Sequence, residues 1–196
     1  MEFCGRICYN VSIQEDRGTT GMLYYTNYPS PLGEILLLAT EEALAGVWLP
    51  GQAVDQKLLA QAQRWDQAPL LVAGCAWLER YFHGACPVPQ ELPLAPQGTP
   101  FRQRVWKRLC EIPYGQLVTY GQLAGEIAEA DGHKMSAQAV GGAVGHNPIS
   151  IIIPCHRVIG ANGNLVGYGG GLALKKRLLE YEGIDMRTLY DPKIKT

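Results

Sequence analysis

The alternation of apolar and polar positions changes character about halfway along the chain. The first half contains three short runs rich in aliphatic and aromatic residues, at 22–28, 34–40 and 43–49. Turn-forming residues such as Pro31-Leu32-Gly33 separate these runs. Short apolar runs between turn signals predict strands. We therefore expect a small antiparallel sheet near the N-terminus.

Two helices and a proline-rich stretch are predicted after the sheet. Residues 54–65 and 70–82 carry apolar positions at helical spacing. Helix-breaking residues then crowd the chain at Pro87, Pro89, Pro93, Pro96 and Gly98. We therefore place a domain boundary at residue 98. The predicted domains are an N-terminal α/β domain at 22–98 and a C-terminal domain at 99–185, with an extension at 1–21 and a tail at 186–196.

The second half carries clear helix start signals. Thr99 is a predicted N-cap followed by Pro100, and Thr119 and Ser136 are further predicted N-caps. Asp131-Gly132 predicts the turn between the last two helices. Two short capped helices across a glycine turn are typical of a helix-turn-helix, whose second helix enters a DNA groove. We call this second helix, from 137 to about 146, the recognition helix.

Composition and charge narrow the class of protein. The chain has 196 residues and is 47% hydrophobic, which suits a globular protein of one or two domains. It has no apolar run near the roughly 18 residues of a membrane span and no signal peptide, so we expect a cytoplasmic protein without a membrane partner. Residues 1–98 carry five Lys/Arg against ten Asp/Glu, and residues 99–196 carry twelve against eight. The basic second half favours a polyanionic partner.

The six cysteines are scattered and predict reduced thiols. Cys4 and Cys8 could form half of a metal site. No Cys/His pair follows them at zinc-like spacing, so we expect no metal.

Cys155 differs from the other cysteines in its neighbours. It follows the apolar run 151–153 and Pro154, so we expect a short irregular segment that leaves a core strand. His156 and Arg157 come next, and an imidazole and a guanidinium lower the pKa of a nearby thiol. A thiolate is a nucleophile, which predicts covalent chemistry at Cys155. Adjacency alone is equally compatible with a cysteine hydrolase.

The segment Ile153-Pro154-Cys155-His156-Arg157-Val158-Ile159 resembles the active-site signature of O6-alkylguanine-DNA alkyltransferases, also called methylated-DNA–protein-cysteine methyltransferases. The resemblance covers about 85 residues of the second half in order. It includes Thr99-Pro100-Phe101, Val105-Trp106, Tyr114-Gly115, Val118-Thr119-Tyr120, Ala139-Val140-Gly141-Gly142-Ala143, Asn147-Pro148, Asn162-Gly163, Gly167-Tyr168, Gly170-Gly171-Leu172, Leu178-Leu179 and Glu182-Gly183. The first half is similar mainly at Ser30-Pro31-Leu32-Gly33.

The resemblance implies an α/β (α+β) fold, with a small sheet-plus-helix domain before a winged helix-turn-helix-like DNA-binding domain. It also implies DNA repair without a cofactor, by a monomer that binds double-stranded DNA containing alkylated guanine. The guanine is flipped out of the duplex, and Cys155 takes the alkyl group irreversibly, once per molecule. O6-methylguanine is the expected main lesion, with O4-methylthymine as a second candidate. His156 would be the base, acting through a water, and Glu182 would orient the imidazole.

The remaining site residues are also implied by the resemblance. Tyr120 would contact the flipped base, Tyr168 would form a pocket wall, and the amide of Gly169 would face O6. Backbone groups of Cys155 and Val158 would bind the guanine edge. Asn147 would tie the recognition helix to the active-site segment, and Lys175 would lie nearby. The expected DNA-binding residues are Ser136, Ala137, Gln138, Gly141, Gly142 and Arg157.

Two positions depart from the family pattern. Members often carry an arginine in the recognition helix that fills the gap left by the flipped base, and Gln138 stands there in this chain. Some relatives bind zinc in the N-terminal domain, and Thr40 stands where one of their cysteine ligands lies.

Three other interpretations compete with alkyl transfer. A cysteine hydrolase would use Cys155 and His156 but would need turnover and an oxyanion hole, and would leave the helix-turn-helix unexplained. A binder of damaged DNA or a regulator could use the same fold, but such relatives lack the reactive cysteine. A structural helical domain without a DNA role is the third.

Overall fold

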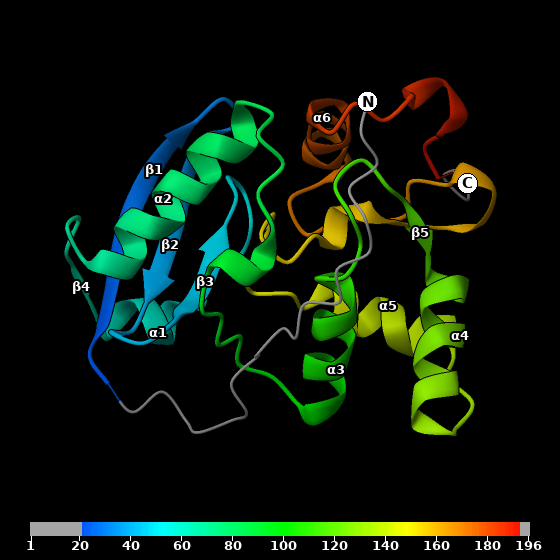
Figure 1. The fold of residues 1–196 in the computed structure, drawn as a ribbon, viewed down its shortest axis with the longest axis horizontal. Coiled ribbons are helices and arrows are strands. Elements are labelled where there is room, and N and C mark those ends of the chain that lie inside the picture. The colour runs from blue at the N-terminus through cyan, green and yellow to red at the C-terminus, as the bar shows by residue number, and fades with distance from the viewer. Residues whose placement is uncertain (1–20, 193–196) are drawn as a thin grey trace.

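The structure is a computed structural model that describes residues 21–192. Its first half is built around a four-stranded sheet (Figure 1). The strand order is β3-β2-β1-β4, with β1 at Leu23–Ser30, β2 at Gly33–Ala39, β3 at Leu44–Trp48 and β4 at Ala62–Arg64. Strands β1 to β3 pair antiparallel, which confirms the predicted sheet. The predicted N-terminal extension up to residue 20, with Cys4 and Cys8, and residues 193–196 of the predicted tail lie outside the described residues.

Side-chain alternation along β2 gives the sheet two covered faces. Ile35 and Leu37 point into the main core, where α2 (Pro69–Phe82) packs through Trp77 and Leu78. Leu38 points to the opposite face. There it joins a smaller cluster of Leu23, Ala45 and Trp48, packed against Tyr25, Leu36, Val54, Leu58 and Ala62. Because successive side chains of a strand point to opposite faces, one apolar run serves both clusters.

The predicted helix at 54–65 is wrong in its second part. Helix α1 spans only Gln56–Ala60, and the chain then forms β4, which pairs parallel to β1. Asp55 caps the helix by accepting from the amides of Lys57 and Leu58 at 2.9 and 3.3 Å. No residue of α1 is fully buried, so helix packing does not hold the segment beyond Ala60. Pairing with the free edge of β1 satisfies its backbone groups instead.

The segment between the halves covers the outer edge of β3. It contains a short 3-10 helix, η1, at Pro89–Glu91. The amide of Leu44 donates to the carbonyl of Pro93 at 2.9 Å, and the amide of Ala95 donates to the carbonyl of Leu44 at 2.8 Å. The predicted linker is therefore attached to the sheet.

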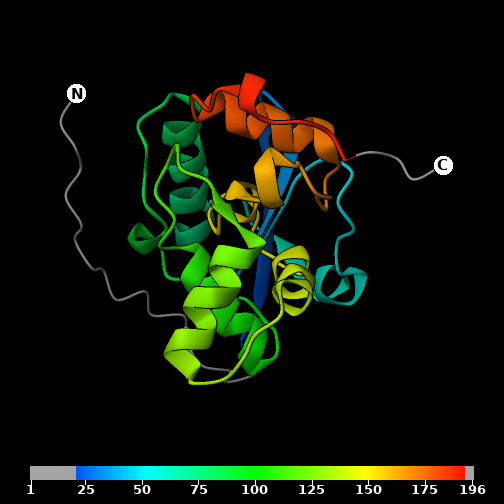
Figure 2. The ribbon, with the colours of Figure 1, turned by 90° about the vertical axis from the view of Figure 1, so that its right-hand side faces the viewer.

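The second half, as far as the structure describes it, consists mainly of α-helices (Figure 2). They are α3 (Pro100–Leu109), α4 (Tyr120–Asp131), α5 (Ala137–Gly145) and α6 (Leu172–Tyr181). The predicted N-caps are confirmed. The side chains of Thr99, Thr119 and Ser136 accept from the amides of the third residue beyond each, at 3.3, 3.1 and 3.1 Å. Gly132 ends α4 in the left-handed conformation, which glycine adopts without strain.

The recognition helix α5 is held against the first helix of its half. The indole nitrogen of Trp106 in α3 donates to the carbonyl of Ala143 at 2.9 Å, and both residues are buried. Val140 and Val144 of α5 lie in the same core as the sheet residues. One continuous core thus joins the sheet to the helix-turn-helix.

The apolar run before Cys155 is buried but is not the predicted core strand. Residues 151–153 form turns, with all three side chains fully buried. The amide of Ile153 donates back to the carbonyl of Ile149 at 3.0 Å, and Ile151 has a φ of +68°. Local hydrogen bonds therefore replace a sheet ladder here. The following 3-10 helix η2, Cys155–Arg157, leads into β6 at Val158–Ile159.

Strand β6 pairs parallel with β5, Val118–Thr119. The chain enters α4 at Tyr120 directly after β5, so this pairing brings Tyr120 close to the segment that carries Cys155. Two further 3-10 helices, η3 at Ala161–Gly163 and η4 at Met186–Thr188, complete the described residues.

Candidate active site

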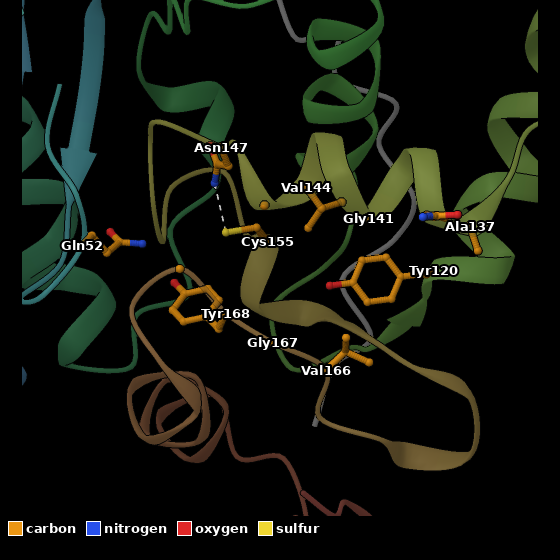
Figure 3. A pocket seen from close by; sticks show the side chains of 13 residues that line it. Gln52, Tyr120, Ala137, Gly141, Val144, Asn147, Cys155, Val166, Gly167 and Tyr168 are labelled. Carbon is orange, nitrogen blue, oxygen red and sulfur yellow. Dashed lines mark hydrogen bonds between the residues drawn. The ribbon is translucent and has the colours of Figure 1, made fainter. Parts of the chain in front are cut away.

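Asn147 connects the end of the recognition helix to Cys155. It lies two residues beyond α5, and its amide nitrogen donates to the carbonyl of Ile153 at 2.8 Å and to Sγ of Cys155 at 3.1 Å. Its oxygen accepts from the amide of Ile149 at 3.0 Å. One side chain thus fixes the turn 149–153 and the position of the sulfur (Figure 3). This is the placement expected for Asn147.

Glu182 lies at the centre of a buried polar cluster behind Cys155. Its Oε1 accepts from His156 Nε2 at 2.6 Å, and its Oε2 accepts from Arg157 Nε at 2.9 Å. The hydroxyl of Tyr81 donates to Oε1 at 2.9 Å, and the amide of Gly115 donates to Oε2 at 3.0 Å. Hydrogen bonds from His156 and Arg157, together with the charge of Arg157, outweigh the cost of burial and hold the pKa of Glu182 down at about 2.

His156 is fully buried, and burial lowers its pKa below the usual value. A neutral imidazole donates through one nitrogen only, and Glu182 can act only as an acceptor for Nε2. The proton is therefore on Nε2, and Nδ1 carries a lone pair. Nδ1 is buried and has no hydrogen-bond partner among residues 21–192. It is free to accept a proton from another group.

Cys155 is buried, with 6% of the residue exposed, and the environment of its thiol differs from the sequence-based expectation. Burial raises its pKa, and the bond from Asn147 and the charge of Lys175 only partly oppose this effect. Arg157, expected to lower the pKa, instead pairs with Glu182 and donates through Nη1 to the carbonyl of Ile112 at 2.6 Å. The thiol is therefore protonated at rest and needs a base to become a nucleophile.

Lys175 supports the site from behind. It is fully buried in α6, and its Nζ donates to the carbonyls of Val158 and Val166 at 2.6 and 3.3 Å. Burial lowers its pKa to about 8. Lys175 therefore ties together the two ends of the loop 159–165. Neither Lys175 nor Val158 lines the pocket in front of Cys155.

A pocket of about 450 Å³ opens in front of Cys155 (Figure 3). Tyr120 and Tyr168, the residues predicted to contact the base and to form a pocket wall, both line it, on either side of the sulfur. The hydroxyl of Tyr168 is buried and makes no hydrogen bond of ordinary geometry within the described part of the chain, but it lies near enough to Cys155 to lower the pKa of the thiol. The full lining is Gln52, Tyr120, Ala137, Gln138, Gly141, Val144, Gly145, Asn147, Cys155, Val166, Gly167, Tyr168 and Gly169.

The residues expected to bind DNA fall into two groups, those of helix α5 and Arg157. The first group belongs to α5, where Ser136 is the N-cap and Ala137, Gln138, Gly141 and Gly142 lie in the first two turns. Ala137, Gln138 and Gly141 also line the pocket. A Cβ at Gly141 would lie 3.6 Å from the ring of Tyr120, whereas a Cβ at Gly142 would meet no atom within 4 Å.

The assignment of Arg157 to DNA binding is wrong. Arg157 is 3% exposed, and its guanidinium is bound to Glu182 and Ile112 inside the protein. Pairing with a buried carboxylate holds this side chain away from the surface.

Two site residues come from the first half and were not predicted. Gln52, in the loop after β3, lines the pocket, and Tyr81 of α2 bonds to Glu182. Both act on partners about one hundred residues away, so no local motif indicates them. Within residues 21–192, no three His, Cys, Asp or Glu side chains are grouped to hold a metal ion. No helix in the same part of the chain is long and apolar enough to span a membrane.

Both halves of the chain match a known family. Residues 23–96 match the family described as "6-O-methylguanine DNA methyltransferase, ribonuclease-like domain". Residues 100–184 match "6-O-methylguanine DNA methyltransferase, DNA binding domain".

Individual relatives agree with these matches. The chain is 43% identical over 165 residues to a methylated-DNA–protein-cysteine methyltransferase of Haemophilus influenzae, covering 83% of this chain and 87% of the relative. It is 42% identical to one from Methanosarcina acetivorans, covering 82% and 99%. The crystal structure of the Mycobacterium tuberculosis O6-methylguanine methyltransferase superposes with a TM-score of 0.71 at 40% identity, covering 82% and 93%. A structure of the Mycobacterium tuberculosis protein in complex with DNA gives a TM-score of 0.70 at 40% identity, covering 81% and 92%.

Proposed function

The chain belongs to the 6-O-methylguanine DNA methyltransferase family, and we propose that it repairs DNA by moving an alkyl group from O6 of guanine to Sγ of its own Cys155. One observation carries the proposal. The thiol of Cys155 and the first turn of the recognition helix line one pocket of about 450 Å³, and the buried His–Glu pair begins at the residue next to Cys155. This volume lies within the range of pockets that hold small ligands.

The proposed substrate reaches Cys155 by leaving the duplex. O6 of a stacked guanine is not accessible to the sulfur of a buried cysteine, so the base must be flipped into the pocket. Ala137, Gln138 and Gly141 of helix α5 form part of the pocket wall. The same three residues are expected to contact a groove of the DNA. Entry of the base beside this helix is therefore the simplest path.

The chemical step follows from the neutral state of His156. Nδ1 would accept the proton of the Cys155 thiol through a water, and the carboxylate of Glu182 at Nε2 would stabilise the imidazolium. The thiolate would attack the first carbon of the alkyl group. The S–C bond forms, the C–O6 bond breaks, and its electron pair stays on guanine. Guanine takes up one proton, which balances the proton lost by the thiol.

The product predicts a single turnover. A thioether at Cys155 is stable to hydrolysis in water, so the alkyl group would stay on the protein. The proposed main substrate is O6-methylguanine in double-stranded DNA, with O4-methylthymine as a second lesion. The proposed active unit is a monomer.

Mass spectrometry of the protein after reaction with excess O6-methylguanine duplex tests the proposal. We expect one added methyl group per molecule, on the peptide that contains Cys155. Multiple turnovers would indicate a hydrolase instead. A methyl group on Cys86, which is exposed, or on Cys110, whose pKa burial raises to about 12, would assign the nucleophile elsewhere.

A further inference from the structure

We propose that Gln52 donates a hydrogen bond from its amide nitrogen to the alkyl substituent, and thereby favours substituents with a hydrogen-bond acceptor beyond the transferred carbon. The inference rests on the proposed function, because it concerns the substrate of the same pocket. It assigns part of the selectivity to a residue of the first half of the chain, in the loop after β3.

The oxygen of the Gln52 amide is already occupied. Oε1 accepts from the backbone amide of Leu49 at 2.7 Å and from the hydroxyl of Ser150 at 2.9 Å. A backbone N–H can only donate, so the oxygen must face Leu49 and the orientation of the amide is determined. Ser150 lies within the turn that Asn147 holds. Gln52 is thus attached to the active-site segment through its oxygen.

The nitrogen of the same amide is left free on the pocket side. Nε2 makes no hydrogen bond to any described residue, and Figure 3 shows it on the side of Gln52 that faces Cys155 and Tyr168. A Cβ at Gly169 would lie 3.2 Å from Nε2. Because Gly169 has no side chain, nothing separates this nitrogen from the stretch 167–169 that lines the pocket.

An unpaired donor in a pocket discriminates between substituents. An apolar alkyl group that displaces water from Nε2 leaves the donor unsatisfied, whereas an acceptor restores the bond. Polar groups built into a site reject analogues that lack the matching group. A methyl group is too short to reach beyond the transferred carbon, so the effect concerns larger substituents.

The transfer itself is unchanged for such substrates. With a 2-methoxyethyl group, sulfur bonds to the first carbon, the bond from that carbon to O6 breaks, and its electron pair stays on guanine. The thiol proton again balances the proton taken up by guanine. The ether oxygen takes no part in the bond changes and keeps its hydrogen bond to Gln52.

The test compares two substituents of the same length and shape. Duplexes carrying O6-(2-methoxyethyl)guanine and O6-n-butylguanine differ by one ether oxygen, which accepts but does not donate. The measured quantity is the ratio of their single-turnover transfer rates, in wild-type protein and in Gln52→Glu. Glutamate keeps the oxygen that accepts from Leu49 and Ser150 but has no N–H. The ratio should fall about two- to tenfold in Gln52→Glu, the range expected for one neutral hydrogen bond.

Gln63→Glu is the matched control, because Gln63 is an exposed residue of β4 that does not line the pocket. It adds the same charge and should keep the wild-type ratio. Equal ratios in wild type and Gln52→Glu would overturn the inference, as would an equal fall in both variants. Transfer of methyl but of neither larger group would overturn it too. Failure of the wild-type protein to accept methyl from O6-methylguanine would instead overturn the proposed function.

Discussion

The hydroxyl of Tyr81 donates a 2.9 Å hydrogen bond to Oε1 of Glu182, a residue 101 positions further along the chain. Tyr81 is fully buried in α2, and its ring lies edge-on to His156 at 6.5 Å between centroids. The first half of the chain therefore contacts Glu182, the carboxylate of the proposed Cys-His-Glu relay, directly. The same oxygen of Glu182 also binds the imidazole.

Tyr81→Phe should slow alkyl transfer by about two- to tenfold, the range for one lost hydrogen bond. Without this donor, Glu182 offers more negative charge to His156, which raises the pKa of the imidazole. The imidazole of His156 is then protonated, and lost as a base, at a higher pH. The acid limb of the pH–rate profile should therefore move to higher pH. Single-turnover rates across pH measure this shift.

Tyr114→Phe is the matched control for Tyr81→Phe. The Tyr114 hydroxyl donates to the carbonyl of Tyr181 at 2.7 Å and does not bind Glu182. Its acid limb should stay at the wild-type position. The same shift in both variants, or a loss of stability with an unchanged profile, would assign Tyr81 a purely structural role.

Glu182→Gln should destabilise the fold by about 3 to 5 kcal/mol, because it leaves the buried Arg157 without its counter-charge. Urea unfolding at pH 7 measures this loss. Glu126→Gln removes an exposed partner of Arg108 and should cost no more than about 1 kcal/mol. A comparable loss in both variants would show that burial of the Glu182 pair is not the cause.

Acid should remove the same contribution from the wild-type protein. The pKa of Glu182 is about 2 in the folded state against an ordinary 4.5, so the unfolded chain binds the proton first as pH falls. The contribution is complete above pH 4.5 and is lost as pH falls towards about 2. Unfolding free energies in this window should decline more steeply for wild type than for Glu182→Gln. Parallel declines would assign the acid sensitivity to other groups.

Cys155→Ser should abolish alkyl transfer and retain binding to alkylated duplex. A serine hydroxyl is a much weaker nucleophile, but it can still accept from Asn147 at the same place. Affinity for DNA comes mainly from phosphate contacts and groove fit, which this change leaves intact. Fluorescence anisotropy measures binding, and Cys86→Ser, at an exposed site, should transfer like wild type. Residual methyl transfer by Cys155→Ser would contradict the assignment of the nucleophile.

Gln138→Ala should slow repair of duplex DNA much more than reaction with free O6-alkylguanine base. Gln138 is an exposed residue in the first turn of α5 and lines the pocket, which suits a residue that fills the gap left by a flipped base. Flipping costs a few kcal/mol, and a free base needs none. Gln138→Arg should preserve or speed duplex repair and steepen its salt dependence. Equal slowing of both substrates by Gln138→Ala would place the residue in the pocket chemistry or the fold instead.

Local sequence signals predicted the elements whose ends are defined by their own residues. Thr99, Thr119 and Ser136 cap their helices through bonds to amides three positions away, so the sequence itself shows them. Strand β4 has no such signal. It exists because the edge of β1 is free to pair with it, and that edge is known only once the sheet is formed.

The site shows the same limit. The order Cys155-His156-Arg157 suggested that both basic side chains serve the thiol. In the structure Arg157 turns to Glu182, because a buried carboxylate needs a counter-charge more than a neutral thiol does. Gln52 acts through Ser150, 98 positions away, and only the packing of the two halves reveals it.

The hydrogen bonds along the outer side of β3 bear on how the protein avoids self-association. The amide of Val47 donates to the carbonyl of Pro148 at 2.8 Å, and the amide of Ser150 donates to the carbonyl of Val47 at 2.9 Å. An uncovered edge strand is a template for pairing with another chain and for aggregation. The turn that precedes Cys155 thus also covers this edge. Any movement that lifted this turn away from the sheet would expose the unpaired edge of β3 to other chains.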